Sequence, residues 1–394
     1  MNVSELTFAK RFDGISGSAI REILKLMATP GMISFGGGNP ASASLPDETI
    51  ARLSVKVLKE NGKNILQYGT TEGYAPLRES LAPYLTRQFG FDAKPDEILP
   101  VSGSSQAMDL LCKALIDPGD VILVENPTFL GNMQCMKLYQ AKIVPVESDE
   151  GGLRVDMLEE AVIKHKPKML YTIPTFQNPT GKTLAAERRP VISALAQKYG
   201  FVVAEDDPYR DLRYSGTPLP SIKSYDQAGL VVFLGSFSKL ISPGIRVGYL
   251  CAHPNILRKC VIGKQSADVH TPTLNQAVVD AFLREDLLDS HVASICKSYG
   301  QQLNAMLTEI SLFPKGTTYT KPEGGLFVWA ELPEGFNAIT LLVKAVERKV
   351  AYVPGSHFFA EGGHENTMRL NFSNSTIEKI HEGMAILRDV IANA

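Results

Sequence analysis

The sequence of 394 residues contains few cysteines and no spacing that would pair them. The five cysteines are odd in number and dispersed, and none belongs to a Cys-x-x-Cys pair. This pattern excludes a disulfide-stabilised scaffold and a zinc knuckle. The seven histidines show no His-x-x-x-His spacing either, so the sequence predicts no metal site.

Long runs of one chemical character are also missing. No stretch of 18 uncharged apolar residues occurs, and the N-terminus has no basic region that leads into an apolar one. Forty basic residues balance 42 acidic ones, without a run that would bind nucleic acid or a membrane surface. We therefore expect a cytoplasmic protein whose partners are small molecules, with no nucleic acid and no membrane among them.

Two nucleotide-binding motifs are absent as well. Gly181, Lys182 and Thr183 imitate the end of a P-loop, but that motif needs glycine five positions before Gly181, where Phe176 stands. No Gly-x-Gly-x-x-Gly motif follows an expected strand. These absences disfavour a magnesium-dependent phosphotransferase and a dinucleotide-binding enzyme.

The chain does contain a long alternation of short apolar runs and helical patterns, between residues 97 and 250. The chain is longer than the usual limit for a single hydrophobic core, so we expect one large domain and a second, smaller domain. The alternation predicts an α/β fold with a mainly parallel sheet of seven strands. The expected strands are Ile98–Val101, Val121–Glu125, Lys142–Val146, Met169–Thr172, Phe201–Glu205, Leu230–Leu234 and Val247–Cys251.

The most informative stretch follows the sixth expected strand. Lys239 lies just past the carboxyl end of that strand, where open α/β sheets place their ligand sites. Partial desolvation there lowers the pKa of a lysine and frees its amine to attack a carbonyl. Ser236, Ser238 and Arg246 suit a phosphate dianion. The combination indicates pyridoxal phosphate, although a Pro-Gly turn with solvated basic residues explains the stretch as well.

Other strand ends carry compatible residues. Ser104 and Ser105 open a helix whose N-terminus could hold a phosphate, or they are ordinary caps. Asn178 is either free to point its amide at a ligand or a turn residue. Asp206 would keep the ring nitrogen of pyridoxal phosphate protonated, and Tyr209 could reach the ring oxygen. An acidic strand end is also common in magnesium-dependent enzymes.

The two ends of the chain add three candidates. An amphipathic helix is expected over residues 18–27, with Arg21 on its polar face. Tyr68 lies in a polar loop before a helix expected from Ala75 to about Phe89. Arg369 lies in an alternating segment that indicates a strand, and without further context it would be an exposed strand residue.

Taken in order, these motifs resemble the fold-type I pyridoxal-phosphate aminotransferases, in the class I/II branch that includes 2-aminoadipate, kynurenine and aromatic aminotransferases. The helix start, the loop asparagine, the Asp-x-x-Tyr strand end and the Ser-x-Ser-Lys segment occur in one order along one sheet. The resemblance extends from Gly36 to Arg369. It implies a fold-type I PLP-transferase, in which a large domain with a mainly parallel seven-stranded sheet carries a smaller α+β domain.

The resemblance also assigns a role to each matching residue. Lys239 would hold pyridoxal 5'-phosphate covalently and then move the α-proton of the substrate, while Asp206 and Tyr209 act on the cofactor's ring. The cofactor-binding set would be Tyr68 from the second subunit, Ser104, Ser105, Phe129, Asn178, Asp206, Tyr209, Ser236, Ser238, Lys239 and Arg246. The substrate-binding set would be Arg369 for the α-carboxylate, Asn178, Gly37, Gly38 and Arg21. Many relatives have tyrosine in place of Phe129, which keeps the ring stacking and lacks the hydroxyl.

The implied activity is ping-pong transfer of an amino group from an α-amino acid to 2-oxoglutarate. The donor stays open among aminoadipate, aromatic and branched-chain amino acids. Arg21 would meet the distal carboxylate of an acidic substrate, or it is a solvated helix residue. A β-lyase or decarboxylase on the same fold and a non-catalytic regulatory domain remain alternatives, because the motifs describe the cofactor and not the bond cleaved.

The resemblance finally implies an organisation for the whole chain. Residues 1–45 would be an N-terminal segment that packs with the small domain, residues 46–286 the large PLP-binding domain, and residues 287–394 the small C-terminal domain. We expect a homodimer with its active site shared between subunits, because Tyr68 is useful only if it is supplied across an interface.

Overall fold

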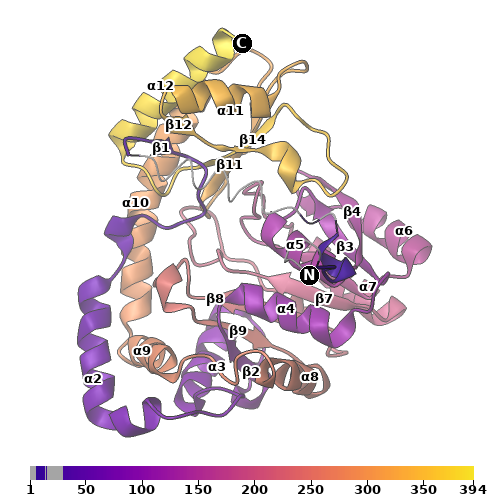
Figure 1. Cartoon of the computed structure of the whole chain (residues 1–394), viewed down its shortest axis with the longest axis vertical. Helices are drawn as coiled ribbons and strands as arrows, with labels where there is room; N and C mark the ends of the chain where they lie inside the picture. Colours follow the sequence, from indigo (N-terminus) through magenta and orange to yellow (C-terminus); the bar gives the residue numbers. More distant parts are fainter. Residues whose placement is uncertain (1–5, 14, 16–29) are drawn as a thin grey trace.

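The computed structural model describes residues 6–13, 15 and 30–394. They form a large region built on a central sheet and a smaller region that contains the C-terminus (Figure 1). The helix expected over residues 18–27, and with it Arg21, lies outside the described residues.

Eight strands of the described residues form the central sheet. In spatial order they are β2 (Ile98–Val101), β9 (Gly248–Cys251), β8 (Val231–Ser236), β7 (Val202–Asp206), β6 (Met169–Thr172), β3 (Val121–Asn126), β4 (Lys142–Asp149) and β5 (Gly152–Leu153). The run from β8 to β4 is parallel, whereas β9 is antiparallel to both of its neighbours and β5 is antiparallel to β4. All seven expected strands are present in a mainly parallel sheet, and β5 adds a short eighth one.

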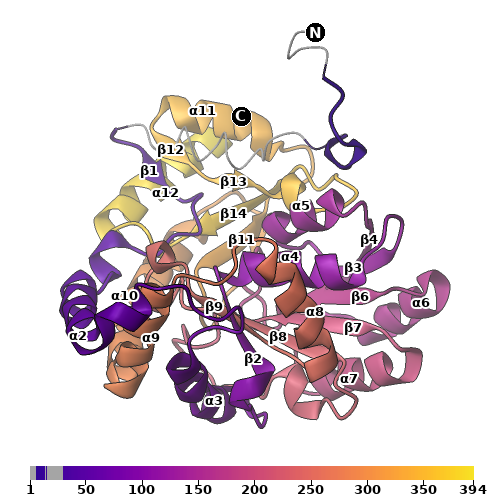
Figure 2. The same ribbon diagram turned by 60° about the horizontal axis from the view of Figure 1, so that its bottom comes forward.

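Helices cover both faces of this sheet. One face packs on α6 (Val155–His165) and α7 (Arg188–Tyr199), and the other on α4 (Ser104–Leu115), α5 (Leu130–Leu138) and α8 (Pro254–Gln265). Side chains alternate along a strand, so Leu170 of β6 joins the cluster of α6 and α7, while Met169 and Tyr171 join the cluster of α4 and α5. Helices α4 and α8 lie against each other in front of the sheet in Figure 2.

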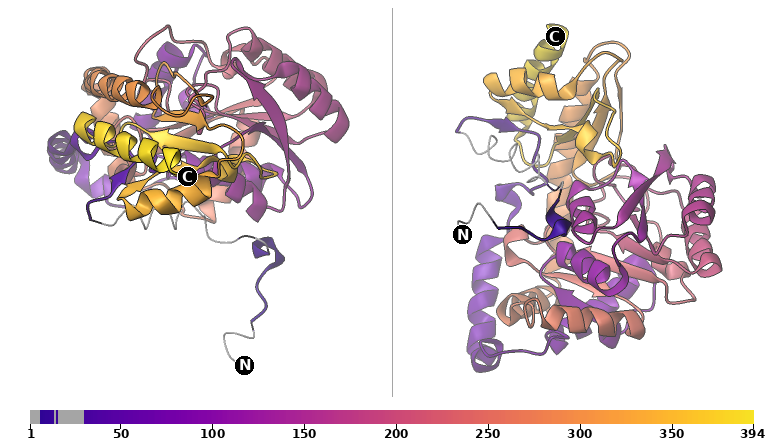
Figure 3. Two further views of the ribbon diagram at one scale, coloured as in Figure 1. Left: turned by 90° about the horizontal axis from the view of Figure 1, so that it is seen from above. Right: turned by 45° about the vertical axis from the view of Figure 1, so that its right-hand side comes forward.

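The smaller region is built on a four-stranded antiparallel sheet. Its elements are β10 (Thr318–Tyr319), β11 (Phe327–Glu331), β14 (Thr367–Asn371), β13 (Val353–Pro354), α11 (Ala338–Glu347) and α12 (Ile377–Ala392). The long helix α10 (Leu287–Ile310) runs from the large region into it, and Figure 3 shows the two regions next to each other.

The N-terminal part of the described chain is attached to the C-terminal part. Strand β1 (Ile33–Ser34) pairs in parallel with β12 (Val350–Ala351).

Three helices complete the large region: α2 (Asp47–Ile65), α3 (Ala75–Phe89) and α9 (Thr273–Arg284). The domain boundaries at residues 45 and 286 remain predictions. None of the helices in the described ranges combines the length and the apolar character needed to cross a membrane.

Candidate active site

A cavity of about 420 Å³ lies at the carboxyl ends of β7 and β8, with β14 of the smaller region on its far side. Its volume is that of a small-molecule site. The residues predicted from the sequence that line it are Gly38, Ser104, Ser105, Phe129, Asn178, Asp206, Tyr209, Ser236, Ser238, Lys239, Arg246 and Arg369. These residues are far apart in the chain, so the fold brings the predicted site together in one place.

Lys239 follows the end of β8 by three residues and is largely enclosed by protein. Its Nζ donates a hydrogen bond of 2.8 Å to the carbonyl oxygen of Gly38. Burial lowers the pKa of Lys239 to about 8, and the positive charges of Arg369 and Arg246 act in the same direction. The neutral, nucleophilic form of the amine is therefore well populated near pH 8.

Arg246 and two serines form one end of the cavity. The Nη2 of Arg246 donates a hydrogen bond of 2.8 Å to the carbonyl oxygen of Ser102, and its Nη1 lies 3.5 Å from the hydroxyl of Ser238. The hydroxyl of Ser236 donates to that of Ser238 at 3.0 Å. The guanidinium stays exposed towards the cavity, so it can take an anion there.

The start of α4 lies at the same end. Gly103 precedes the helix with a φ of 85°, and a Cβ at this position would overlap Nη2 of Arg246. Glycine therefore lets the guanidinium lie directly against the helix start. The first turn of a helix has backbone N–H groups without helical partners, and here Ser104 and Ser105 occupy it. Helix start, serines and arginine together make an anion site that fits a phosphate group.

Asp206 ends β7, lines the cavity and is buried. Its Oδ2 accepts hydrogen bonds from the hydroxyl of Tyr171 at 2.9 Å and from Nδ2 of Asn132 at 3.3 Å. Its Oδ1 is buried and has no hydrogen-bond partner among the described residues. Burial raises the pKa of Asp206 to about 7, against the lowering effect of the Tyr171 hydroxyl. A protonated pyridine nitrogen would satisfy the unpaired oxygen and offset this cost.

Arg369 lies on β14 and is 3% exposed, so the interpretation as an exposed strand residue is wrong. Its Nη1 donates to Oδ1 of Asn178 at 2.8 Å and its Nη2 to the carbonyl oxygen of Gly36 at 2.6 Å, whereas Nε has no partner among the described residues. The guanidinium lies over the rings of Phe327 and Phe358. Burial lowers the pKa of Arg369 to about 10. A buried cation of this kind suits an anionic ligand, whose charge would offset the cost of removing the guanidinium from water.

Three further side chains that line the cavity suit a flat ring. Asn178 donates from Nδ2 to the hydroxyl of Tyr209 at 3.4 Å, so both polar groups face the same space. The ring of Phe129 packs on Gly131, where an added Cβ would meet it at 2.5 Å. A bulkier residue at position 131 would displace this ring.

Two predicted residues of the described chain do not line this cavity. Tyr68 is 82% exposed in the loop between α2 and α3, beside the ring of His270. Gly37 does not line the cavity, and Gly36 and Gly38 do. Arg21 lies outside the described residues.

Two residues that contact Asp206 have no local signal in the sequence. Tyr171 belongs to β6 and Asn132 to α5, and neither lies in a motif. An indirect signal for these contacts was the parallel pairing of β6 with β7, which places side chains of neighbouring strands on one face. The choice of Tyr171 among them required the structure.

The fold and the site define an enzyme that uses pyridoxal phosphate. The unpaired carboxylate oxygen of Asp206 fits the ring nitrogen, the anion site at α4 fits the phosphate, and Lys239 lines the same cavity. Residues 30–387 match the model of the family Aminotransferase class I and II. The chain belongs to this family.

Its relatives agree with this assignment. The chain is 43% identical over 393 residues to aromatic-amino-acid aminotransferase 1 of Thermococcus litoralis, covering 98% of this chain and 94% of that protein. A structure of Pyrococcus horikoshii kynurenine aminotransferase in complex with PMP superposes with a TM-score of 0.94 at 40% identity, covering 98% and 97% of the two chains.

A third relative is an α-aminoadipate aminotransferase of Thermus thermophilus, complexed with N-(5'-phosphopyridoxyl)-L-leucine. It gives a TM-score of 0.91 at 40% identity and the same coverage of 98% and 97%. The chain is thus an amino-acid aminotransferase of fold type I with pyridoxal phosphate as its cofactor. The magnesium-dependent alternative does not hold.

Proposed function

We propose that this aminotransferase moves the amino group of an α-amino acid to 2-oxoglutarate by a ping-pong mechanism. The observation that supports it most is the buried Arg369 in the same cavity as Lys239, with an Nε that has no partner in the described chain. An α-amino acid would place its carboxylate at Arg369 and its amine near Lys239.

Lys239 is the proposed acid and base. When bound, pyridoxal phosphate supplies an electron sink and stores the amino group between the two half-reactions. A lysine with a pKa of about 8 can accept the α-proton of the substrate at Nζ and return it afterwards. The carbonyl oxygen of Gly38 holds Nζ at 2.8 Å inside the cavity.

The other cavity residues are proposed to hold the cofactor in three places. Asp206 would bind the ring nitrogen through its unpaired Oδ1. Asn178 and Tyr209 would bind the ring oxygen, and Phe129 would cover the face of the ring. The phosphate would be bound by Ser104, Ser105, Ser236, Ser238 and Arg246.

Initial rates with phenylalanine as donor and 2-oxoglutarate as acceptor test this proposal. Glutamate should form in equal amount to phenylpyruvate, and double-reciprocal plots at several acceptor concentrations should be parallel. Intersecting lines would contradict the ping-pong order. A cysteine S-conjugate has a leaving group on its β-carbon, and its conversion to pyruvate and ammonia without 2-oxoglutarate, at a rate above that of phenylalanine transamination, would indicate a β-lyase instead.

The proposed donors are aminoadipate, aromatic and branched-chain amino acids. The names of the relatives above refer to aromatic amino acids, kynurenine and α-aminoadipate. Among the described cavity-lining residues, the cations are Lys239, Arg246 and Arg369, and each already has a proposed partner. A distal carboxylate therefore needs a further cation, for which Arg21 is our candidate.

Single-turnover half-reactions without acceptor test this role of Arg21. The Arg21→Ala variant should react more slowly with aminoadipate and at the wild-type rate with phenylalanine. An equal loss with both donors would remove Arg21 as the selector.

We further propose that the enzyme is a cytoplasmic homodimer. Tyr68 supports the dimer, because an 82% exposed aromatic side chain remote from its own cavity is available to a second subunit. In that subunit it would contact the phosphate of the cofactor.

A further inference from the structure

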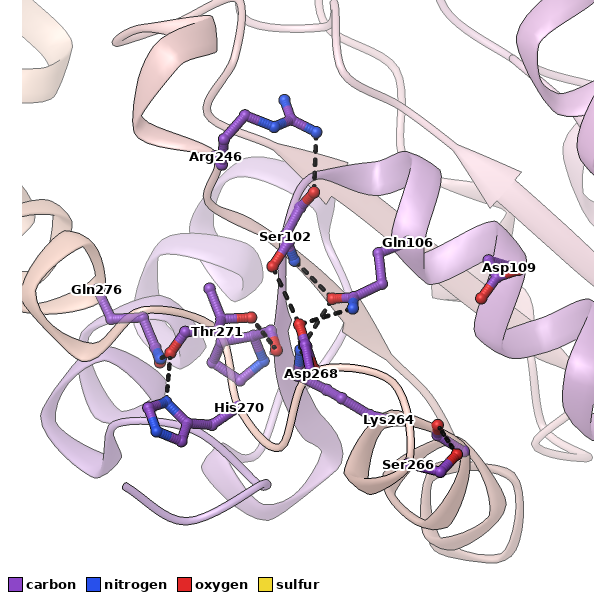
Figure 4. Close-up of polar contacts among 12 residues, drawn as sticks. Ser102, Gln106, Asp109, Arg246, Lys264, Ser266, Asp268, His270, Thr271 and Gln276 are labelled. Carbon is purple, nitrogen blue, oxygen red and sulfur yellow. Dashed lines mark hydrogen bonds and ion pairs between the residues drawn. The ribbon is translucent and has the colours of Figure 1, made fainter. Parts of the chain in front are cut away.

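Lys264 is a fully buried cation with no part in the proposed chemistry. It lies in the last turn of α8 and does not line the active-site cavity. Its Nζ donates to Oε1 of Gln106 at 2.8 Å and to both carboxylate oxygens of Asp268 at 2.9 Å (Figure 4). A buried ammonium is costly unless it is paired, and here all three of its protons have acceptors.

The same cluster holds Ser102, which stands just before the helix start at Gly103. The backbone N–H of Ser102 donates to Oε1 of Gln106 at 2.7 Å, and its hydroxyl donates to Oδ2 of Asp268 at 3.2 Å. Gln106 also donates from Nε2 to the same Oδ2 at 2.8 Å. Every polar group of Ser102 on this side is therefore fixed (Figure 4).

The remaining polar group of Ser102 points to the active site. Its carbonyl oxygen accepts the hydrogen bond from Nη2 of Arg246 at 2.8 Å, and Gly103 brings the guanidinium against the helix start. Ser102, Gln106, Lys264 and Asp268 do not line the cavity. The hydrogen bonds that connect these residues to the cavity run through Ser102 and Arg246.

We propose that Lys264, Asp268 and Gln106 are positioning residues that set the affinity for the cofactor's phosphate through Ser102. Loss of the cluster frees the Ser102 peptide. The backbone N–H groups at the start of α4 and the guanidinium of Arg246 are then no longer held in a fixed position relative to each other. The inference rests on the proposed phosphate-binding role of Ser104, Ser105 and Arg246. If the cluster served only to pack α4 on α8, its loss would weaken the binding of every cofactor form equally, with or without a phosphate.

Binding of two cofactor forms to the full-length enzyme separates these roles. We would measure dissociation constants for pyridoxal phosphate and for pyridoxal, which lacks the phosphate, by equilibrium dialysis after removal of the native cofactor. The ratio of the two constants reports the phosphate contribution alone. In Lys264→Met and in Gln106→Met this contribution should fall by about tenfold or more, because charge-assisted contacts to the phosphate lose their geometry.

Two controls are chosen from the same pair of helices. Lys113→Met removes a lysine of α4 that pairs with Asp109 at 3.5 Å, remote from Ser102. Leu257→Ala truncates a buried side chain of α8 and lowers stability without touching the cluster. Both controls should keep the wild-type ratio, whatever their melting temperatures.

An unchanged ratio in Lys264→Met and Gln106→Met would overturn the inference, and so would an equal fall in Leu257→Ala. If Lys264→Met does not fold, Gln106→Met decides alone, since it removes no charge. The variant Arg246→Ala tests the phosphate site on which the inference rests. If Arg246→Ala lowers the ratio and the two cluster variants do not, the phosphate site stands and the positioning role fails. If Arg246→Ala leaves the ratio unchanged, the phosphate site itself is misassigned.

Discussion

At the residue scale, the site depends on two ionisable groups that the fold has taken out of water. The pKa of Lys239 falls to about 8 and that of Asp206 rises to about 7, and burial is the largest cause of both shifts. Each shift means that the charged form of the group destabilises the folded, cofactor-free protein. Pyridoxal phosphate would offset both costs, since it offers a carbonyl to the amine and a ring nitrogen to the carboxylate.

The first prediction concerns Asp206→Asn, which keeps the shape of the side chain. Turnover should fall by about a hundredfold or more, because an unprotonated ring is a poor electron sink. The cofactor-free protein should become more stable. The folded pKa of Asp206, about 7, lies above its ordinary value of 3.8, so its stabilising contribution is present below pH 4 and is lost as the pH rises through 7.

Urea unfolding of the cofactor-free protein at pH 8 and pH 5 measures this effect. The gain from Asp206→Asn should be larger at pH 8, since each unit of pKa difference corresponds to about 1.4 kcal/mol. A gain that is equal at both pH values would contradict the argument. Unchanged turnover would mean that Asp207 or some other group is the ring partner.

A second prediction concerns Tyr171→Phe, which removes one hydrogen bond to Asp206. The carboxylate loses a donor, so kcat should fall by about tenfold while KM for the donor and cofactor content stay near wild type. Tyr352→Phe is the matched control, because Tyr352 is equally buried and donates to Ala338 away from the cavity. Equal losses of kcat in both variants would show that Tyr171 is only a packing residue.

At the element scale, the strands were predictable from their apolar patterns, whereas the residues at which they end were not. The expected strands stop at Glu205 and Leu234, whereas β7 extends to Asp206 and β8 to Ser236. The site residues therefore occupy the last positions of strands, where polar side chains interrupt the apolar pattern that identifies a strand. The helix expected from Ala75 to about Phe89 is confirmed.

Pairings between distant segments had no local signal. Ile33–Ser34 pairs with Val350–Ala351, and Gly152–Leu153 forms an edge strand of two residues. Contacts of Asp206 with Tyr171 and Asn132 depend likewise on the order of strands in the sheet. Sequence patterns report the environment of one segment, so such contacts needed the three-dimensional arrangement.

The prediction at this scale concerns the start of α4. Gly103→Ala should lower the affinity for pyridoxal phosphate, because its Cβ would displace the guanidinium of Arg246. Gly119→Ala is the control, since Gly119 also has a positive φ and nothing lies within 4 Å of its added Cβ. Both variants should lose about 1 kcal/mol or more of stability from backbone strain. Equal cofactor affinities in the two variants would contradict the proposed anion site.

At the scale of the whole molecule, the cavity is a meeting point of the two regions. Lys239 follows a strand of the large sheet and Arg369 lies in the smaller sheet, so the two regions together supply the proposed substrate site. Tyr68 is the predicted site residue that the described chain turns outwards. Its exposure supports the proposed dimer, because the resemblance assigns Tyr68 to the site of a second subunit.

Mixed dimers test that proposal. Lys239→Ala and Tyr68→Ala should each be strongly impaired as pure proteins. When the two are expressed together, a mixed dimer has one site with both residues intact, so activity should exceed that of either parent. Activity that equals the average of the parents would contradict a shared site, as would a fully active monomer in sedimentation.

The most direct test of the central claim identifies the residue that carries the cofactor. Borohydride reduction of the holoenzyme, followed by peptide mass spectrometry, should place the phosphopyridoxyl group on Lys239. Prior incubation with an amino donor should prevent the labelling, and addition of 2-oxoglutarate should restore it. A phosphopyridoxyl group on Lys264 or on a surface lysine, or labelling of Lys239 that the donor does not affect, would contradict the account.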